Sequence, residues 1–195
     1  MEVDLYEDRA PTTVNNFVAL AAVGFYDGLQ IFRNAPSIFA LQTGSATNEA
    51  SFQIGYTFGD ELEAAQEEGY TAGSLAMANS GPNTNGSQFF FTYGDSSLEA
   101  NYTKFGQVTE GLDVLERIGE IPVDGEAPTE RIFLESVEIF IDGKALTEIL
   151  EEQGEGSSGD GDAEDEPSGS PSPGESPTAS PSPTEAATAP EEEES

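Results

Sequence analysis

Residues 77–90 read Met77-Ala-Asn-Ser-Gly-Pro-Asn-Thr-Asn-Gly-Ser-Gln-Phe-Phe90, and this stretch decides how the fold is interpreted. Apolar and amide side chains surround a turn that is crowded with glycine, proline and asparagine. These three residue types punctuate turns, whereas Met77, Phe89 and Phe90 are of the types that fill cores. Composition alone therefore favours a turn between two buried strands, although an ordinary turn does not require so many special residues.

Short apolar segments flank this stretch on both sides. Alternation predicts a strand at residues 1–6, and Val14, Phe17, Val18 and Ala21 fall on one face of a helix that a threonine at 12 or 13 can cap. Further strands are expected at 29–32, 38–41, 73–78, 88–93, 105–108 and 131–141, and a second helix at 111–118. Many short strands with two helices predict a mainly β fold, a barrel or sandwich closed by helices.

The 195 residues include no His and no Cys. This excludes Ser-His-Asp and Cys-His nucleophiles, histidine general bases, and zinc, haem or iron–sulfur sites with His or Cys ligands. Disulfides are excluded for the same reason. We therefore expect no cofactor and no metal.

Charge narrows the possible partners. With 38 Asp and Glu against 6 Lys and Arg, the formal net charge is -32, and the basic residues form no patch. Such a chain repels nucleic acid, and no run is apolar enough for a membrane span. We expect a monomer, because like charges oppose association. As the chain stands, it predicts a soluble, cytoplasmic protein; an export signal upstream would make it extracytoplasmic.

The chain divides at about residue 150. Residues 151–195 contain no Val, Ile, Leu, Met, Phe, Tyr, Lys or Arg and are rich in Asp, Glu, Pro and Ser. Without apolar area to offset about 1 to 2 kcal/mol of backbone entropy per residue, this acidic tail is predicted to be disordered. All aromatic residues fall in 1–150, which is long enough for one core.

Four ordered motifs give the chain a family resemblance. MANSGPNTNGSQFF resembles the signature of the cyclophilin-type peptidyl-prolyl cis-trans isomerases, and YEDRAPTTVNNFVAL, FYDGLQIFR and LEANYTKFGQV resemble segments of the same family. The resemblance covers roughly residues 2–140. It implies a mainly β, cyclophilin-like closed barrel capped by two helices, with residues 1–150 as the isomerase domain.

The resemblance also implies a site. Arg33 matches the family's catalytic arginine. The positions that match its substrate-binding residues are Phe39, Gln42, Met77, Ala78, Asn79, Gln88, Phe90, Leu98, Tyr102 and Phe105. Tyr102 stands where the family usually has histidine, and it keeps an aromatic ring with a polar tip.

The chemistry suits a protein without histidine. Rotation about an X-Pro bond is slow because amide resonance must be lost, and no bond is made or broken. A guanidinium near the prolyl nitrogen would stabilise its lone pair, while an apolar pocket holds the ring. We therefore expect a prolyl isomerase acting on proline-containing peptides or unfolded proteins. The alternative is a cyclophilin-fold module that binds proline peptides with little or no turnover.

Two departures from the family pattern carry expectations of their own. The segment from Arg33 to Gln42 is one residue longer than in the common pattern, so residues 34–37 must absorb an insertion that bears on the aim of the arginine. In addition, Met1 falls where the family's second strand is already under way. Because a barrel cannot close without its first strand, we expect the natural chain to begin upstream of Met1.

Overall fold

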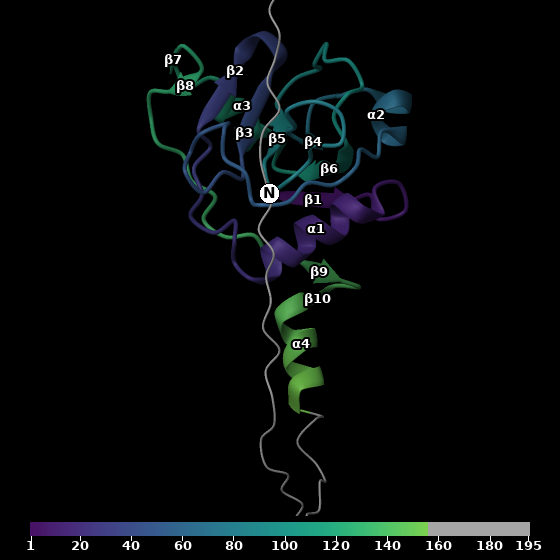
Figure 1. Cartoon of the computed structure of the whole chain (residues 1–195). Coiled ribbons are helices and arrows are strands. Elements are labelled where there is room, and N and C mark those ends of the chain that lie inside the picture. The colour runs from purple at the N-terminus through teal and green to yellow at the C-terminus, as the bar shows by residue number, and fades with distance from the viewer. Residues whose placement is uncertain (156–195) are drawn as a thin grey trace, which may run out of the picture. The chain divides into compact units, whose positions relative to one another are not determined.

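An antiparallel sheet of six strands organises residues 1–155, the part of the chain that the computed structural model describes (Figure 1). Its strands run in the order β1-β6-β4-β5-β3-β2. They are β1 (Glu2–Leu5), β2 (Arg33–Ala35), β3 (Ala40–Thr43), β4 (Ser74–Met77), β5 (Phe89–Thr92) and β6 (Lys104–Glu110). The sequence MANSGPNTNGSQFF thus forms the end of β4, the connecting loop and the start of β5, as its composition predicts.

Helices and two small hairpins complete the fold. The helices are α1 (Pro11–Ala22), α2 (Glu63–Glu68), α3 (Leu112–Gly119) and α4 (Leu146–Glu155), with a 3-10 turn η1 (Pro36–Ile38). The hairpins pair β7 (Val123–Asp124) with β8 (Ala127–Pro128), and β9 (Phe140–Ile141) with β10 (Lys144–Ala145). Two helices, α1 and α3, match the expected segments. The family-based picture of a mainly β fold with few helices is confirmed.

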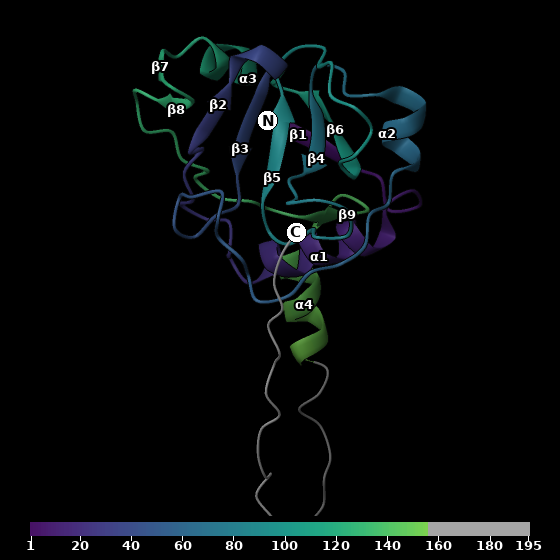
Figure 2. The same cartoon turned by 45° about the horizontal axis from the view of Figure 1, so that its top comes forward.

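Helix α1 lies across one face of the sheet, below the strands in the view of Figure 2. Its apolar stripe packs inward, and the ring of Phe17 contacts those of Tyr26, Phe89 and Phe105 at centroid distances of 5.0, 5.4 and 5.3 Å. Tyr26, Phe89 and Phe105 are at most 1% exposed. This face is the main core of the protein.

The start of α1 differs from the prediction of a threonine cap. Glu61, from the segment before α2, accepts hydrogen bonds from the backbone N–H groups of Thr12 (3.0 Å) and Thr13 (2.9 Å) and from the Thr13 hydroxyl (2.8 Å). Burial alone would raise the pKa of Glu61, but these hydrogen bonds outweigh it and lower the pKa. A carboxylate distant in sequence therefore satisfies the free donors of the first turn.

The closed barrel that the family resemblance implies is not present in residues 1–155, where the six strands form an open sheet. Within these residues β1 has a partner strand only on its β6 side. The segment 131–139 is not a regular strand. Its backbone forms only a few hydrogen bonds with residues 28–31, among them Gly28 N to Leu134 O (2.7 Å) and Ile31 N to Ile132 O (2.9 Å). Its apolar alternation is nevertheless correct, since Ile132, Leu134, Val137 and Ile139 pack against the core.

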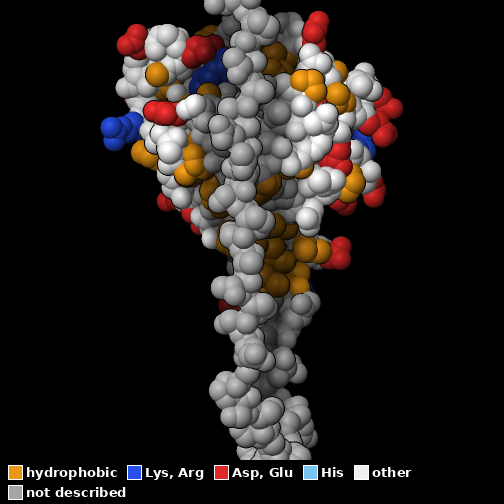
Figure 3. Space-filling view, in the orientation of Figure 1, with side chains coloured by type: hydrophobic (Ala, Val, Ile, Leu, Met, Phe, Trp, Pro, Cys, Tyr) orange, Lys and Arg blue, Asp and Glu red, His pale blue; other side chains and the backbone are white. Residues whose placement is uncertain are grey.

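The C-terminal boundary also differs from the prediction. Helix α4 runs through Glu155, whereas disorder was expected from residue 151; the rest of the predicted tail, 156–195, lies outside the described residues. Apolar side chains gather on the surface around β9, β10 and α4 (Figure 3), where Phe140, Ile141 and Leu150 are 61, 46 and 52% exposed. Among residues 1–155, no helix is both long and apolar enough to cross a membrane.

Candidate active site

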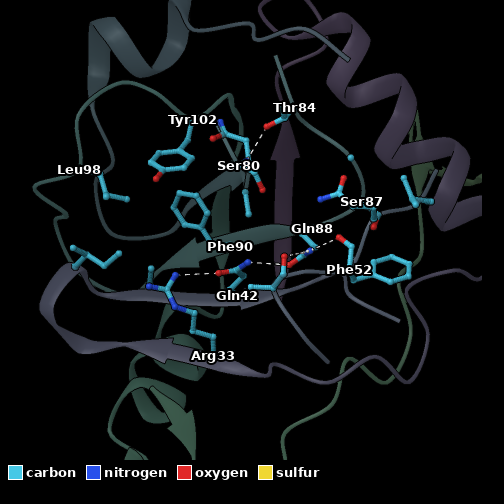
Figure 4. Close-up of a pocket in the computed structure, with 18 residues that line it drawn as sticks. Arg33, Gln42, Phe52, Ser80, Thr84, Ser87, Gln88, Phe90, Leu98 and Tyr102 are labelled. Atoms are coloured by element: carbon cyan, nitrogen blue, oxygen red, sulfur yellow. Dashed lines mark hydrogen bonds between the residues drawn. The ribbon is translucent and has the colours of Figure 1, made fainter. Parts of the chain in front are cut away.

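A cavity of about 210 Å³ opens on the side of β5 opposite the main core (Figure 4). Strands β2, β3 and β5 and the loops before α2, after β4 and before β6 surround it. Its lining residues are Arg33, Ile38, Ala40, Gln42, Ala50, Phe52, Gln53, Ile54, Ala78, Asn79, Ser80, Thr84, Gly86, Ser87, Gln88, Phe90, Leu98 and Tyr102. An apolar cavity of about 150 Å³ accepts a benzene ring, so this one has room for a proline ring.

A row of polar side chains crosses the floor of the cavity. Arg33 donates from Nη1 to Gln42 Oε1 (3.0 Å), Gln42 donates from Nε2 to Gln88 Oε1 (2.9 Å), and Gln88 donates to the carbonyls of Ala50 (3.1 Å) and Phe52 (2.9 Å). Figure 4 shows these contacts as a continuous row from Arg33 through Gln42 to Gln88. Because each amide both donates and accepts, its orientation is fixed. The row therefore holds one edge of the guanidinium in place before any ligand arrives.

Arg33 is held on a second side by Glu126. Its Nε donates to Glu126 Oε2 (2.7 Å) and its Nη2 to Glu126 Oε1 (3.1 Å). The hydrogen bonds from Arg33 lower the pKa of Glu126, so the carboxylate stays ionised near neutral pH. The arginine side chain is 34% exposed, which leaves it in contact with both solvent and cavity.

Aromatic rings form the apolar wall. Phe90 is 5% exposed, and its ring meets the Tyr102 ring edge to face at 5.5 Å and the Tyr70 ring at 6.1 Å. The Tyr70 hydroxyl donates to the Tyr102 carbonyl (2.7 Å) and accepts from the Tyr102 N–H (2.9 Å). Burial raises the pKa of Tyr70 to about 12, so this hydroxyl remains a donor. It fixes the loop that carries Leu98 and Tyr102 against Phe90.

The loop between β4 and β5 is fixed by its own side chains. Asn79 donates from Nδ2 to the carbonyl of Asn101 (2.9 Å), and Thr84 Oγ1 accepts from the backbone of Ser80 (2.8 Å). Gly44 approaches this loop so closely that a Cβ there would lie 2.3 Å from the Ser87 carbonyl oxygen, and its φ is +83°. Only glycine fits this position.

The amino-acid sequence was compared with protein families and with known proteins. Residues 1–139 match the family model of the cyclophilin type peptidyl-prolyl cis-trans isomerases. The chain belongs to this family. It is 36% identical over 152 residues to peptidyl-prolyl cis-trans isomerase-like 3 of Gallus gallus, covering 75% of this chain and 93% of the relative. It is 42% identical over 128 residues to peptidyl-prolyl cis-trans isomerase-like 1 of Aspergillus oryzae, covering 64% and 78%.

Solved structures give the same result. The crystal structure of a cyclophilin type peptidyl-prolyl cis-trans isomerase of Cryptosporidium parvum, in the presence of the dipeptide Ala-Pro, matches with a TM-score of 0.63 and 31% sequence identity. The match covers 69% of this chain and 88% of that one. The family resemblance read from the four motifs is therefore confirmed.

Most of the site residues that this cyclophilin sequence predicts do line the cavity. They are Arg33, Gln42, Ala78, Asn79, Gln88, Phe90, Leu98 and Tyr102. Met77 and Phe105 do not, since both are wholly buried in the core on the α1 side. Strand alternation explains the difference for Met77, because neighbours on a strand point to opposite faces.

Phe39 also lies outside the cavity. Its φ of 53° ends the 3-10 turn η1, and its ring is 42% exposed and packs on Tyr93 at 5.5 Å. Ile38 lines the cavity in its place. The extra residue is absorbed at the tip of the β2–β3 hairpin, below which Arg33 pairs directly with Gln42.

A second set of residues lines the cavity but is not among the site residues predicted from the sequence. Several of them, from Ser80 to Ser87, belong to the family signature and stand between residues that were named. Others, including Phe52 and Ile54, lie in the long loop before α2, which shows no strand or helix period. Large apolar residues inside a loop rich in Gly, Asn and acids were the available signal, because a solvated loop does not need them.

Proposed function

We propose that the cavity binds the proline of an unfolded or extended peptide segment and that Arg33 is the catalytic group that accelerates rotation about the preceding peptide bond. One observation carries this proposal: a guanidinium fixed by side chains lines the same cavity as a buried aromatic wall. The activity of the family supports this choice of ligand, as does the crystal structure of the C. parvum relative in the presence of the dipeptide Ala-Pro.

The roles follow from the energetics of the amide. The rotation barrier is about 18 to 20 kcal/mol because the prolyl nitrogen lone pair is conjugated with the carbonyl. An N–H of Arg33 that donates to this nitrogen stabilises the lone pair once conjugation is lost, and so binds the transition state more tightly than the ground state. Bringing tens of seconds to milliseconds takes about 10^4-fold, or about 5 to 6 kcal/mol.

The other residues hold the substrate. Phe90, Leu98 and Tyr102 supply the apolar wall for the proline ring, and Gln42, Ala78, Asn79 and Gln88 supply its contacts along the rest of the cavity. A dry wall strengthens the hydrogen bond from Arg33, because water no longer competes for it. We assign no substrate contact to Phe39, Met77 or Phe105, which lie elsewhere.

A protease-coupled assay on an Ala-Pro tetrapeptide tests the proposal. We expect the wild type to accelerate isomerisation and Arg33→Ala to lose at least about 100-fold in kcat/KM, the effect of removing a donor to developing charge. Arg117→Ala is the matched control, since Arg117 lies on α3 with its side chain 70% exposed. Peptide binding without acceleration by the wild type would instead establish the binding module. Full activity in a folded Arg33→Ala variant would contradict the role of Arg33.

A further inference from the structure

Glu126 occupies the turn between β7 and β8, beside the arginine and outside the cavity lining. Its backbone is fixed to β2, because Asn34, the residue after Arg33, donates its N–H to the Glu126 carbonyl at 2.7 Å. Its side chain is about half exposed, at 47%. Glu126 and Arg33 are 93 residues apart in sequence, so this contact depends on how the β7–β8 hairpin docks.

Asn34 of β2, which holds the Glu126 carbonyl, is itself anchored to the rest of the fold. Asn34 is wholly buried, donates from Nδ2 to the Gly119 carbonyl at the end of α3 (3.1 Å), and accepts from the Tyr93 hydroxyl (3.2 Å). The hairpin closes on itself through Thr129 N to Pro122 O at 2.8 Å. The carboxylate of Glu126 is therefore presented to Arg33 from a fixed backbone.

The hydrogen bonds to Glu126 and Gln42 use some of the N–H donors of Arg33 and leave others free for a substrate. A guanidinium has five N–H groups. Glu126 takes the Nε–H and one on Nη2, and Gln42 takes one on Nη1. Within residues 1–155, one N–H on each terminal nitrogen is left without a hydrogen-bond acceptor. A two-point carboxylate contact fixes the plane of the guanidinium, whereas the single contact to Gln42 would let it rotate.

We propose that Glu126 is a positioning residue for the reaction, which orients the guanidinium plane of Arg33 so that its free N–H groups meet the prolyl nitrogen. The inference rests on the catalytic role proposed for Arg33. Glu126 acts through Arg33 and does not touch the substrate. Because small misplacements of a reacting group are costly and the proline ring is bound by other residues, its loss lowers kcat and leaves KM nearly unchanged.

The test compares Glu126→Ala and Glu126→Gln with Asp124→Asn in the full chain. Asp124 is an exposed carboxylate on the same hairpin, and within residues 1–155 its side chain has no hydrogen bond or ion pair, so its variant removes an equal charge without touching Arg33. With the Ala-Pro tetrapeptide, we expect Glu126→Ala to lower kcat about tenfold with KM within about twofold. Glu126→Gln, which keeps one acceptor, falls between, and Asp124→Asn matches the wild type.

Two further readouts separate positioning from a structural role. In an Arg33→Ala background, adding Glu126→Ala causes no further loss of kcat. The Nε–H signal of Arg33 in a ¹H–¹⁵N spectrum, where the chain offers only Arg9, Arg117 and Arg131 besides it, shifts and exchanges faster with water in Glu126→Ala but not in Asp124→Asn. Thermal unfolding checks that each variant is folded, and Glu126→Gln carries the test if Glu126→Ala is not.

Each other outcome overturns the inference. Wild-type kcat in folded Glu126→Ala, with activity lost in Arg33→Ala, refutes positioning and leaves the proposed function intact. A raised KM with unchanged kcat would make Glu126 a substrate contact. Full activity in Arg33→Ala would refute the proposed role of Arg33, and the inference with it.

Discussion

Phe89 and Phe90 are neighbours on β5, yet they serve opposite sides of the sheet. Phe89 packs against Phe17, Tyr26 and Phe91, large rings that fill the space beneath α1. Phe90 instead belongs to a cluster whose other buried members are mostly alanines, Ala35, Ala40, Ala65 and Ala76. Small neighbours beside a large ring leave a hollow. The same residue type therefore stabilises the protein on one face and forms a binding wall on the other.

The largest expected effect is on stability, from Phe89→Ala. Truncation leaves a void among close-packed rings, so the free energy of unfolding falls by about 3 to 5 kcal/mol. Urea denaturation followed by circular dichroism measures it, with Phe89→Leu as a control that loses less. A loss in Phe89→Ala below about 1 kcal/mol would show that the α1 face is not the main core.

Phe90→Ala tests the cavity face of β5. We expect kcat/KM for the Ala-Pro tetrapeptide to fall by the equivalent of about 1 to 3 kcal/mol, because a buried aromatic wall is lost. The free energy of unfolding falls less than in Phe89→Ala, since the new space joins an existing cavity. Unaltered activity in a folded variant would contradict the assignment of the pocket.

A smaller effect is expected from Glu61→Gln, which changes the cap of α1 and leaves the cavity untouched. The variant loses about 0.5 to 2 kcal/mol at pH 7, because the amide accepts fewer hydrogen bonds and lacks the charge. The pKa of Glu61 is lowered in the folded state, so its contribution is complete above pH 4.5 and is lost as pH falls through the lower, folded value. Unfolding curves between pH 7 and 3 measure this difference. Equal pH dependence in both proteins would refute the cap.

The smallest effect is expected from deleting residues 156–195. We propose that the activity resides in the domain that precedes this segment, which lacks large apolar side chains to contribute to a core. The thermal midpoint and kcat/KM for a short peptide should therefore stay within experimental error of the full chain. A marked change in either would show that the acidic segment contacts the domain.

The mainly β fold and the family could be predicted from sequence motifs and apolar alternation. The signature around Met77–Phe90 and the stripe of α1 are local patterns, and local patterns survive in the structure. The contacts that could not be predicted from the sequence depend on long-range geometry. The cap of α1 joins Glu61 to Thr13, 48 positions away in sequence, and the two-point hydrogen bonding between Glu126 and Arg33 joins residues 93 positions apart. Neither carboxylate stands out in a chain with 38 acidic residues.

Three of the residues that match the family's site, Phe39, Met77 and Phe105, do not line the cavity. Met77 and Ala78 are adjacent, but only Ala78 reaches the cavity. Phe39 matches the family's pocket phenylalanine by its distance from Gln42, but Ile38 lines the cavity instead. Spacing in a motif identifies the strand, whereas strand direction and turn geometry decide which side chain points inward.

One NMR titration tests most directly the claim that the Phe90 face of the sheet binds and rotates X-Pro bonds. An Ala-Pro tetrapeptide is added to the labelled protein, and cis–trans exchange of the peptide is measured in the same samples. We predict shifts at the side chains of Arg33, Gln42, Gln88 and Phe90, none at Phe17 or Phe89, and exchange that quickens from tens of seconds to milliseconds. Shifts without faster exchange, or shifts confined to the α1 face, would contradict the account.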